Sequence, residues 1–135
     1  MSAAILQGTP ATTLDTDIWI DLPFRQYMRV LNLCVGLGAT VRANTVVELS
    51  NGSLVNFLYE VHGLRSFRAE YRQARILPWL GTGVAVLPLA RIHASKSLVG
   101  RPKDLAHLPL LEQTMALQRR LSRRRRRRNP PQPTT

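Results

Sequence analysis

Apolar and polar residues follow two different periods along this chain. From Asp17 to Leu22 they alternate, which is typical of a strand with one buried face, and Pro23 follows directly. Across residues 24–37 the apolar side chains recur every three or four positions, and glycines follow. This spacing predicts an amphipathic helix next to the strand.

The same two periods assign elements to the rest of the chain. Val, Leu, Phe and Tyr dominate residues 41–49 and 54–61, and Asn51-Gly52 between these segments strongly favours a β-hairpin. Further predicted elements are a helix over 64–75, a hairpin of 76–80 and 84–87, a helix over 88–98 and a helix over 103–121. The order indicates an α+β fold in which a small mixed sheet, with strand 17–22 at its centre, is flanked by helices.

The length and charge of the chain point to one domain with a basic tail. The chain has 135 residues, enough for a single core, and its 19 Lys and Arg against 8 Asp and Glu give a net charge of +11. Eight of the arginines lie within residues 119–128, which leaves +3 for residues 1–118. The extreme charge therefore belongs to the tail and says little about the folded part.

The distribution of cysteine and apolar residues indicates a cytoplasmic protein. The single cysteine, Cys34, excludes an intramolecular disulfide, and the three histidines are scattered without metal-ligand spacing. The first ten residues lack the basic start of a signal peptide, and the longest apolar run, 76–90, is interrupted by prolines and glycines. We expect no membrane insertion.

Two aspartates before the first strand are candidate metal ligands. Asp15 and Asp17 are two positions apart, so in a strand both carboxylates point to the same side and can converge on a divalent cation. Such a cation neutralises charge on the phosphates of a nucleotide during phosphoryl or nucleotidyl transfer. The alternative is that both aspartates belong to a solvated turn.

A second group of charged residues lies around the start of the last helix. Lys96, Arg101, Lys103 and Asp104 could present cations to a triphosphate or a polynucleotide. The alternative is structural: Lys96 complements the dipole of its own helix, and Asp104 caps the next helix.

Taken together, the segments GTPATTLDTDIWID and LPLARIHASKSLVGRPKDLAHLPLLE resemble the minimal nucleotidyltransferase family, in the branch of AbiEii-like toxin-type proteins. The resemblance covers most of residues 3–118 and implies a nucleotidyltransferase-like domain over 1–118. It implies that Asp15 and Asp17 bind Mg²⁺ or Mn²⁺, and that Lys96, Arg101, Lys103 and Asp104 bind a nucleoside triphosphate. It also implies a cognate antitoxin or other protein as a partner.

The chain departs from the family pattern at three places. A Gly-Ser turn that contacts nucleotide phosphates would fall at or ahead of Met1, which implies an N-terminally shortened fold. Asn56 stands where the family carries a third catalytic carboxylate, and Glu48 or Glu60 could substitute only in a different register. Asn56 can offer a carbonyl oxygen but no negative charge and no general base. His107 replaces the last aspartate of the second segment.

The arginine-rich end, residues 119–135, cannot bury a core, so we expect it to be disordered or a fraying extension of the last helix. Its arginines would bind RNA phosphates without sequence preference, or would merely be solvated. The candidate residues are Arg119, Arg120, Arg123, Arg124, Arg125, Arg126, Arg127 and Arg128. The leading hypothesis is a nucleotidyltransferase-like protein that transfers a nucleotidyl group to RNA or protein with weak activity. The alternative is a catalytically impaired homologue that acts as an interaction or RNA-binding module.

Overall fold

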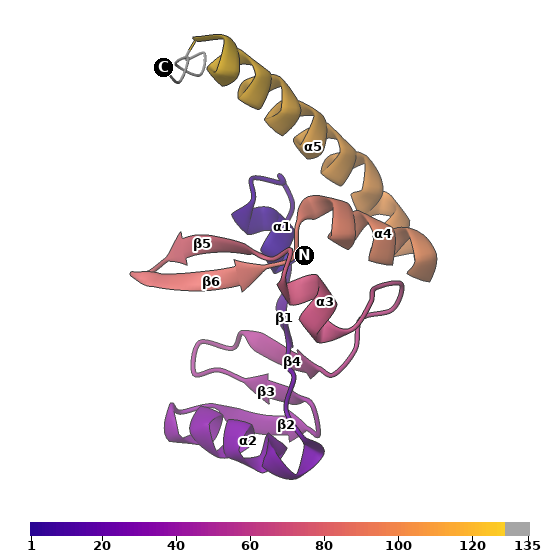
Figure 1. Cartoon of the computed structure of the whole chain (residues 1–135). Helices are drawn as coiled ribbons and strands as arrows, with labels where there is room; N and C mark the ends of the chain where they lie inside the picture. The colour runs from indigo at the N-terminus through magenta and orange to yellow at the C-terminus, as the bar shows by residue number, and fades with distance from the viewer. Residues whose placement is uncertain (129–135) are drawn as a thin grey trace.

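The computed structural model describes residues 1–128 and shows an α+β fold, as the sequence predicts (Figure 1). The elements are α1 (Ser2–Leu6), β1 (Asp15–Trp19), the 3₁₀ turn η1 (Phe24–Gln26), α2 (Tyr27–Gly36), β2 (Thr40–Ala43), β3 (Val46–Glu48), β4 (Leu54–Leu58), α3 (Phe67–Tyr71), β5 (Arg75–Trp79), β6 (Thr82–Val86), α4 (Leu89–Val99) and α5 (Pro102–Arg128).

The main sheet has four strands in the order β1-β4-β3-β2, with β1 parallel to β4 and the other pairs antiparallel. The hairpin expected at Asn51-Gly52 is confirmed between β3 and β4. Gly52 adopts φ +83°, where a side chain would be strained, and the Asn51 side-chain oxygen accepts the Ser53 N–H at 3.0 Å.

Two expectations about this sheet are wrong. β1 spans 15–19 and lies at the edge, because it pairs with β4 alone among residues 1–128, and this pairing ends near Leu58, where β4 itself ends. The single strand expected over 41–49 is two short strands, with Ala43 paired to Val46 across a tight turn. Both halves carry β-forming residues, so the periodicity did not reveal the turn at Asn44 and Thr45.

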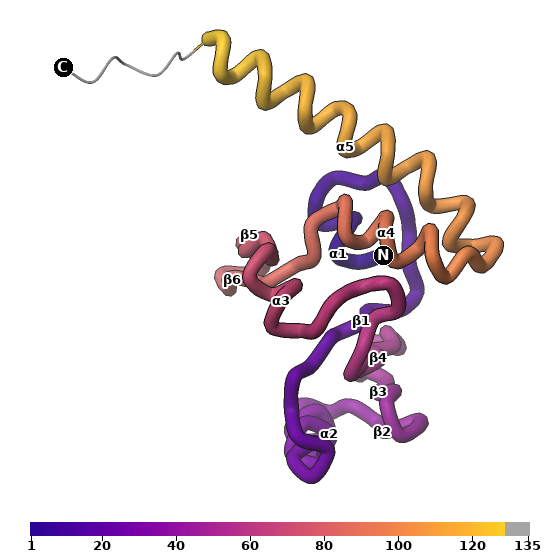
Figure 2. The backbone as a smooth tube through the Cα atoms, turned by 45° about the vertical axis from the view of Figure 1, so that its right-hand side comes forward, coloured from indigo at the N-terminus to yellow at the C-terminus, as the bar shows by residue number. Residues whose placement is uncertain are grey.

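Hydrophobic residues form two separate cores. In one core α2 packs on the sheet, and its buried residues are Tyr27, Leu31, Ala39, Val47, Val55 and Phe57. The other joins α1, α4 and α5 through Ala4, Leu89, Ile92 and Leu111. Figure 2 shows α2 and the sheet at one end of the molecule and the α1–α4–α5 group at the other.

Two of the shorter elements also differ from the sequence expectation. α3 covers only 67–71, because Ser66 caps it through a 3.4 Å bond from the Ala69 N–H, and the chain before Ser66 is not helical. The turn of the β5–β6 hairpin lies at Leu80 and Gly81, both with positive φ, rather than at residues 81–83. This is the backbone that a two-residue hairpin loop requires.

α5 extends further than the predicted helix. It continues past Pro109 and past residue 121 to Arg128 (Figure 1). The arginines of 119–128 therefore lie on its last turns, and all of them are exposed. The remaining residues of the predicted tail, 129–135, lie outside the described part of the chain. No helix within residues 1–128 is both long and apolar enough to cross a membrane.

Candidate functional site

A cavity of about 420 Å³ lies between the β1–β4 edge of the sheet and the corner where α4 meets α5. Because these elements come from distant parts of the sequence, the fold brings both predicted segments to one place. All seven residues predicted for the folded part line this cavity: Asp15, Asp17, Asn56, Lys96, Arg101, Lys103 and Asp104.

Asp15 and Asp17 lie on exposed β1 and share the strand face that borders the cavity. The Thr13 hydroxyl donates to Asp15 Oδ1 at 3.0 Å. Asn56 sits directly opposite Asp17 in the parallel register, and its Nδ2 donates to Asp17 Oδ1 at 3.3 Å. The arrangement therefore places two carboxylates and one amide next to each other.

The opposite wall carries the cationic segment. Asp104 is 1% exposed, and its carboxylate accepts from Lys96 Nζ at 2.8 Å and from Arg101 Nε at 2.6 Å. Arg101, with Lys96, holds the pKa of Asp104 well below its usual range. Because the carboxylate binds these side chains, its role here is to orient two cations.

The electrostatic pattern of the cavity is bipolar. One wall has the carboxylates of Asp15 and Asp17, and Glu60 borders the cavity just beyond β4, whereas the other wall has three cations and a single carboxylate. Lys103 forms no ion pair within residues 1–128. The hydrogen bond to Asp104, and then the negative charges of Asp104, Asp17 and Asp15, raise the pKa of Arg101 although burial opposes the shift. A polyphosphate that carries a divalent cation has charges that match both walls.

Several cavity residues were not identified from the sequence, and Glu60 was named only as a substitute carboxylate. Leu58, Glu60 and His62 follow Asn56 at every second position and all line the cavity, so the alternation of β4 continued past its end would have found them. Of the two substitute carboxylates, Glu60 borders the cavity, whereas Glu48 pairs with Arg42 and does not. His107 is not among the lining residues; its Nδ1 is buried without a partner in the described chain, and burial lowers the pKa of His107.

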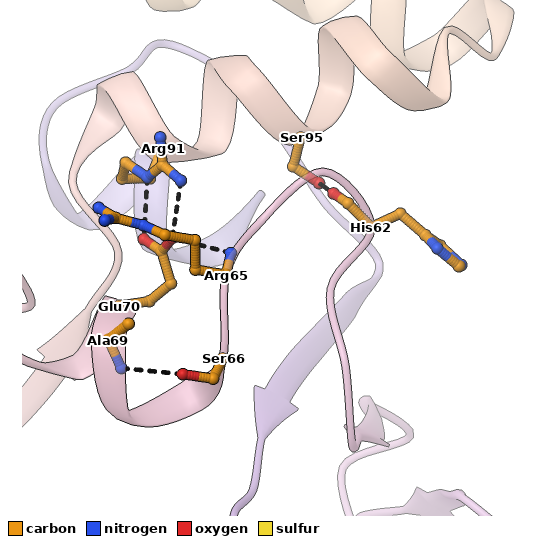
Figure 3. Close-up of polar contacts among 7 residues, drawn as sticks. All are labelled: His62, Arg65, Ser66, Ala69, Glu70, Arg91 and Ser95. Atoms are coloured by element: carbon orange, nitrogen blue, oxygen red, sulfur yellow. Dashed lines mark hydrogen bonds and ion pairs between the residues drawn. The ribbon is translucent and has the colours of Figure 1, made fainter.

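Polar contacts hold the segment after β4, including α3, against α4, as Figure 3 shows. Ser95 Oγ donates to the His62 carbonyl at 2.7 Å. Glu70, which is fully buried, accepts a bidentate pair from Arg91 at 2.8 and 2.6 Å and the Arg65 N–H at 3.0 Å. The bonds from Arg91, and then that from the Arg65 N–H, lower the pKa of Glu70 to about 2 although burial opposes the shift.

The oxygen donors on β1 and β4 suit a hard cation. Carboxylate and amide oxygens are the ligands that Mg²⁺ and Mn²⁺ prefer. Nowhere in residues 1–128 do three His, Cys, Asp or Glu side chains come together as a metal-binding group, so Asp15 and Asp17 would need further oxygens from substrate or water. The residues present fit a cation carried by a nucleotide better than a cation bound by protein alone.

Comparison with known proteins returned no match: no family model, no curated protein and no solved structure corresponds to this chain.

Proposed function

We propose that the cavity binds a nucleoside triphosphate with Mg²⁺ or Mn²⁺ and supports slow nucleotidyl transfer to RNA or protein, in the manner of the nucleotidyltransferase family that the sequence resembles. The observation that carries the proposal is the convergence of two aspartates and three cations on opposite walls of one cavity. These residues are about 80 positions apart in the sequence. They come together because α1 contacts β1 and packs with α4 and α5, and because Ser95 of α4 bonds the loop after β4.

Each wall has a distinct role. Asp15 and Asp17 hold the cation, which when bound neutralises charge that develops on phosphate oxygens. Arg101 and Lys103 face the phosphates, because the Arg101 side chain is 58% exposed and Lys103 is exposed as well. The Lys96 side chain is only 14% exposed, and Asp104 is a positioning residue that sets the direction of Lys96 and Arg101.

Asn56 limits the rate that this site can reach. It occupies the position next to Asp17 where a third carboxylate would activate the acceptor hydroxyl, and an amide cannot accept that proton. The presence of this amide, which donates a hydrogen bond to Asp17, favours the second candidate. That candidate is a catalytically impaired homologue that acts as an interaction or RNA-binding module.

The binding step is tested by calorimetric titration of Mg²⁺ with a non-hydrolysable ATP analogue. We expect Asp15→Asn and Asp17→Asn to abolish the heat of binding, because each removes an anionic ligand. Asp21→Asn is the matched control, since Asp21 is an exposed carboxylate just beyond β1 that does not line the cavity. An unchanged isotherm in both cavity variants would show that the two aspartates bind no metal.

The catalytic step is tested by transfer of a radiolabelled nucleotide to RNA or protein. We expect Asn56→Asp to raise the rate, since one well-placed electrostatic group is commonly worth about 10²-fold. The unmodified chain should label an acceptor slowly or not at all. Robust labelling by the unmodified chain that Asp15→Ala abolishes would rule out the impaired-homologue candidate.

A further inference from the structure

A second cavity, of about 510 Å³, lies where α5 passes the first turn of α4. Four arginines line it, and its lining contains no aspartate or glutamate. We call it the arginine cleft and define it by Arg75, Arg119, Arg123 and Arg126.

The arginine cleft is assembled from separate elements. Positions 119, 123 and 126 follow the spacing that places side chains on one face of a helix, and this face of α5 turns toward Pro88 and Leu89. Arg75 comes from β5. The three α5 positions cover about 10 Å along the helix axis, which is long enough for more than one anionic group.

Buried glutamine contacts fix the walls of the arginine cleft. Gln7 is 8% exposed, and its Oε1 accepts from Arg75 NH1 at 3.2 Å while its Nε2 donates to the Leu87 carbonyl at 2.7 Å. Gln118, one residue before the first cleft arginine of α5, donates to the Gln7 backbone oxygen at 2.8 Å. The guanidinium of Arg75 and the last turns of α5 are thus held at a set distance across the cleft.

The charge of the arginine cleft is not compensated by the described chain. None of its four arginines forms an ion pair within residues 1–128, whereas Arg42, Arg65, Arg68, Arg91 and Arg101 all do. The first turn of α4 adds partial positive charge, because Pro88 provides no side-chain cap. Like charges at this density repel one another, and an anion in the cleft would offset that repulsion.

We propose that the arginine cleft binds the phosphodiester backbone of single-stranded RNA. Guanidinium groups pair with phosphate oxygens through two parallel hydrogen bonds, and a polynucleotide supplies one such charge per residue at regular spacing. Insertion of α5 into a lipid surface would require an apolar face, but Leu121 is the only apolar residue among 119–128. Binding of RNA here requires neither Asp15 nor nucleotide, so the inference goes beyond the proposed function.

The test compares two triple variants of equal charge. The first changes Arg119, Arg123 and Arg126 to Gln, and the second changes Arg120, Arg124 and Arg127 to Gln. The second triple has the same spacing on α5 but does not line the cleft. Binding of a fluorescent oligouridylate is measured by anisotropy at several salt concentrations, without nucleotide.

We expect the first triple variant to weaken binding much more than the second. Its slope of log affinity against log salt should fall by about 2, at roughly 0.7 per phosphate contact on a single strand. Arg75→Gln, which lies far from the tail in sequence, should lower the slope by roughly 0.7 on its own. Circular dichroism should show the same melting for both triples, since all six positions are exposed.

Equal losses in the two triples would overturn the proposal, because a helix that binds as an undirected polycation makes no distinction between its faces. An unchanged slope in Arg75→Gln would overturn it as well, since β5 would then form no part of the site. Tighter binding to phosphatidylserine vesicles than to RNA would assign the cleft to lipid headgroups instead. Asp17→Asn should bind RNA like the unmodified chain, which separates this test from that of the nucleotide cavity.

Discussion

Glu70 and Asp104 are both fully buried carboxylates held by arginine, yet they serve different parts of the molecule. Glu70 joins α3 to Arg91 of α4, and neither partner lines either of the two cavities described above. Asp104 holds Lys96 and Arg101, and all three line the cavity between the β1–β4 edge and the corner of α4 and α5. Both carboxyl groups have strongly lowered pKa values.

The comparison shows that burial, ion pairing and a lowered pKa do not by themselves identify a site. These three properties describe a stable buried ion pair wherever it occurs. What distinguishes Asp104 is that the cations it orients also reach a cavity that contains opposite charges. Changes at Glu70 should therefore affect stability alone, whereas changes at Asp104 should affect stability and ligand binding.

The largest effect on stability is expected from Arg91→Met. The change leaves Glu70 buried without its bidentate partner, and an uncompensated buried charge costs about 3 to 5 kcal/mol. Urea unfolding measures the loss in the free energy of unfolding. Arg72→Met is the control, because Arg72 is an exposed arginine just after α3 without an ion pair in the described chain. A similar loss in both variants would mean that the Glu70–Arg91 pair is not what stabilises this region.

A pH effect follows from the lowered pKa of Glu70. Since the folded-state pKa lies below the unfolded value, the pair contributes stability above pH 4.5, and that contribution is lost as the pH falls toward about 2. The contribution is up to about 3 kcal/mol at neutral pH. In Glu70→Gln, the free energy of unfolding should be lower than that of the unmodified chain at neutral pH, and it should fall less as the pH drops from 4.5 to about 2.

Asp104→Asn should lower the free energy of unfolding by about 2 kcal/mol. This is less than the loss in Arg91→Met, because Arg101 can turn into solvent. Unlike Glu70→Gln, it should also weaken binding of the ATP analogue, since Lys96 and Arg101 lose the acceptor that orients them. Calorimetry on both variants measures this difference. Tighter binding in Asp104→Asn would show that the added positive charge matters more than orientation.

The smallest effect is expected for the exposed pair of Arg42 and Glu48 on β2 and β3. Because both side chains stay in water, Arg42→Gln should leave the urea midpoint unchanged within error. A clear drop in the midpoint would show that exposed pairs in this protein contribute as much as buried ones, and the contrast drawn from Glu70 would then fail.

The sequence predicted which residues would lie together better than it predicted the order of strands in the sheet. Asp15, Asp17, Lys96 and Arg101 were expected to cooperate, and the fold does bring them to one cavity. Local patterns also located the Asn51-Gly52 hairpin. The edge position of β1 could not be predicted, because alternation shows that a strand has two faces but does not show which neighbours it pairs with.

The Glu70–Arg91 pair was missed for a related reason. Glu70 lies in a segment rich in arginine, where the pattern predicts one more charged residue on a solvated helix. Its partner, Arg91, is 21 positions away in the sequence. Burial of a charge depends on tertiary packing, which periodicity does not report. The placement of the arginines of 119–128, by contrast, does not depend on tertiary packing. They lie on α5 because a helix that begins at Pro102 continues through them.

The course of α5 has one further consequence, for the spacing of the two cavities. Asp104 and Arg126 lie on the same helix, about 33 Å apart along its axis. Leu111 and Thr114, both buried, and the bond from Gln118 to Gln7 hold the part of α5 beyond Pro109 against the rest of the fold. The helix therefore sets a fixed distance between the two cavities. If both proposals hold, an RNA strand bound in the arginine cleft reaches the cavity proposed for the nucleotide only with an end of matching length. The fold would then set where along a strand a nucleotide is added.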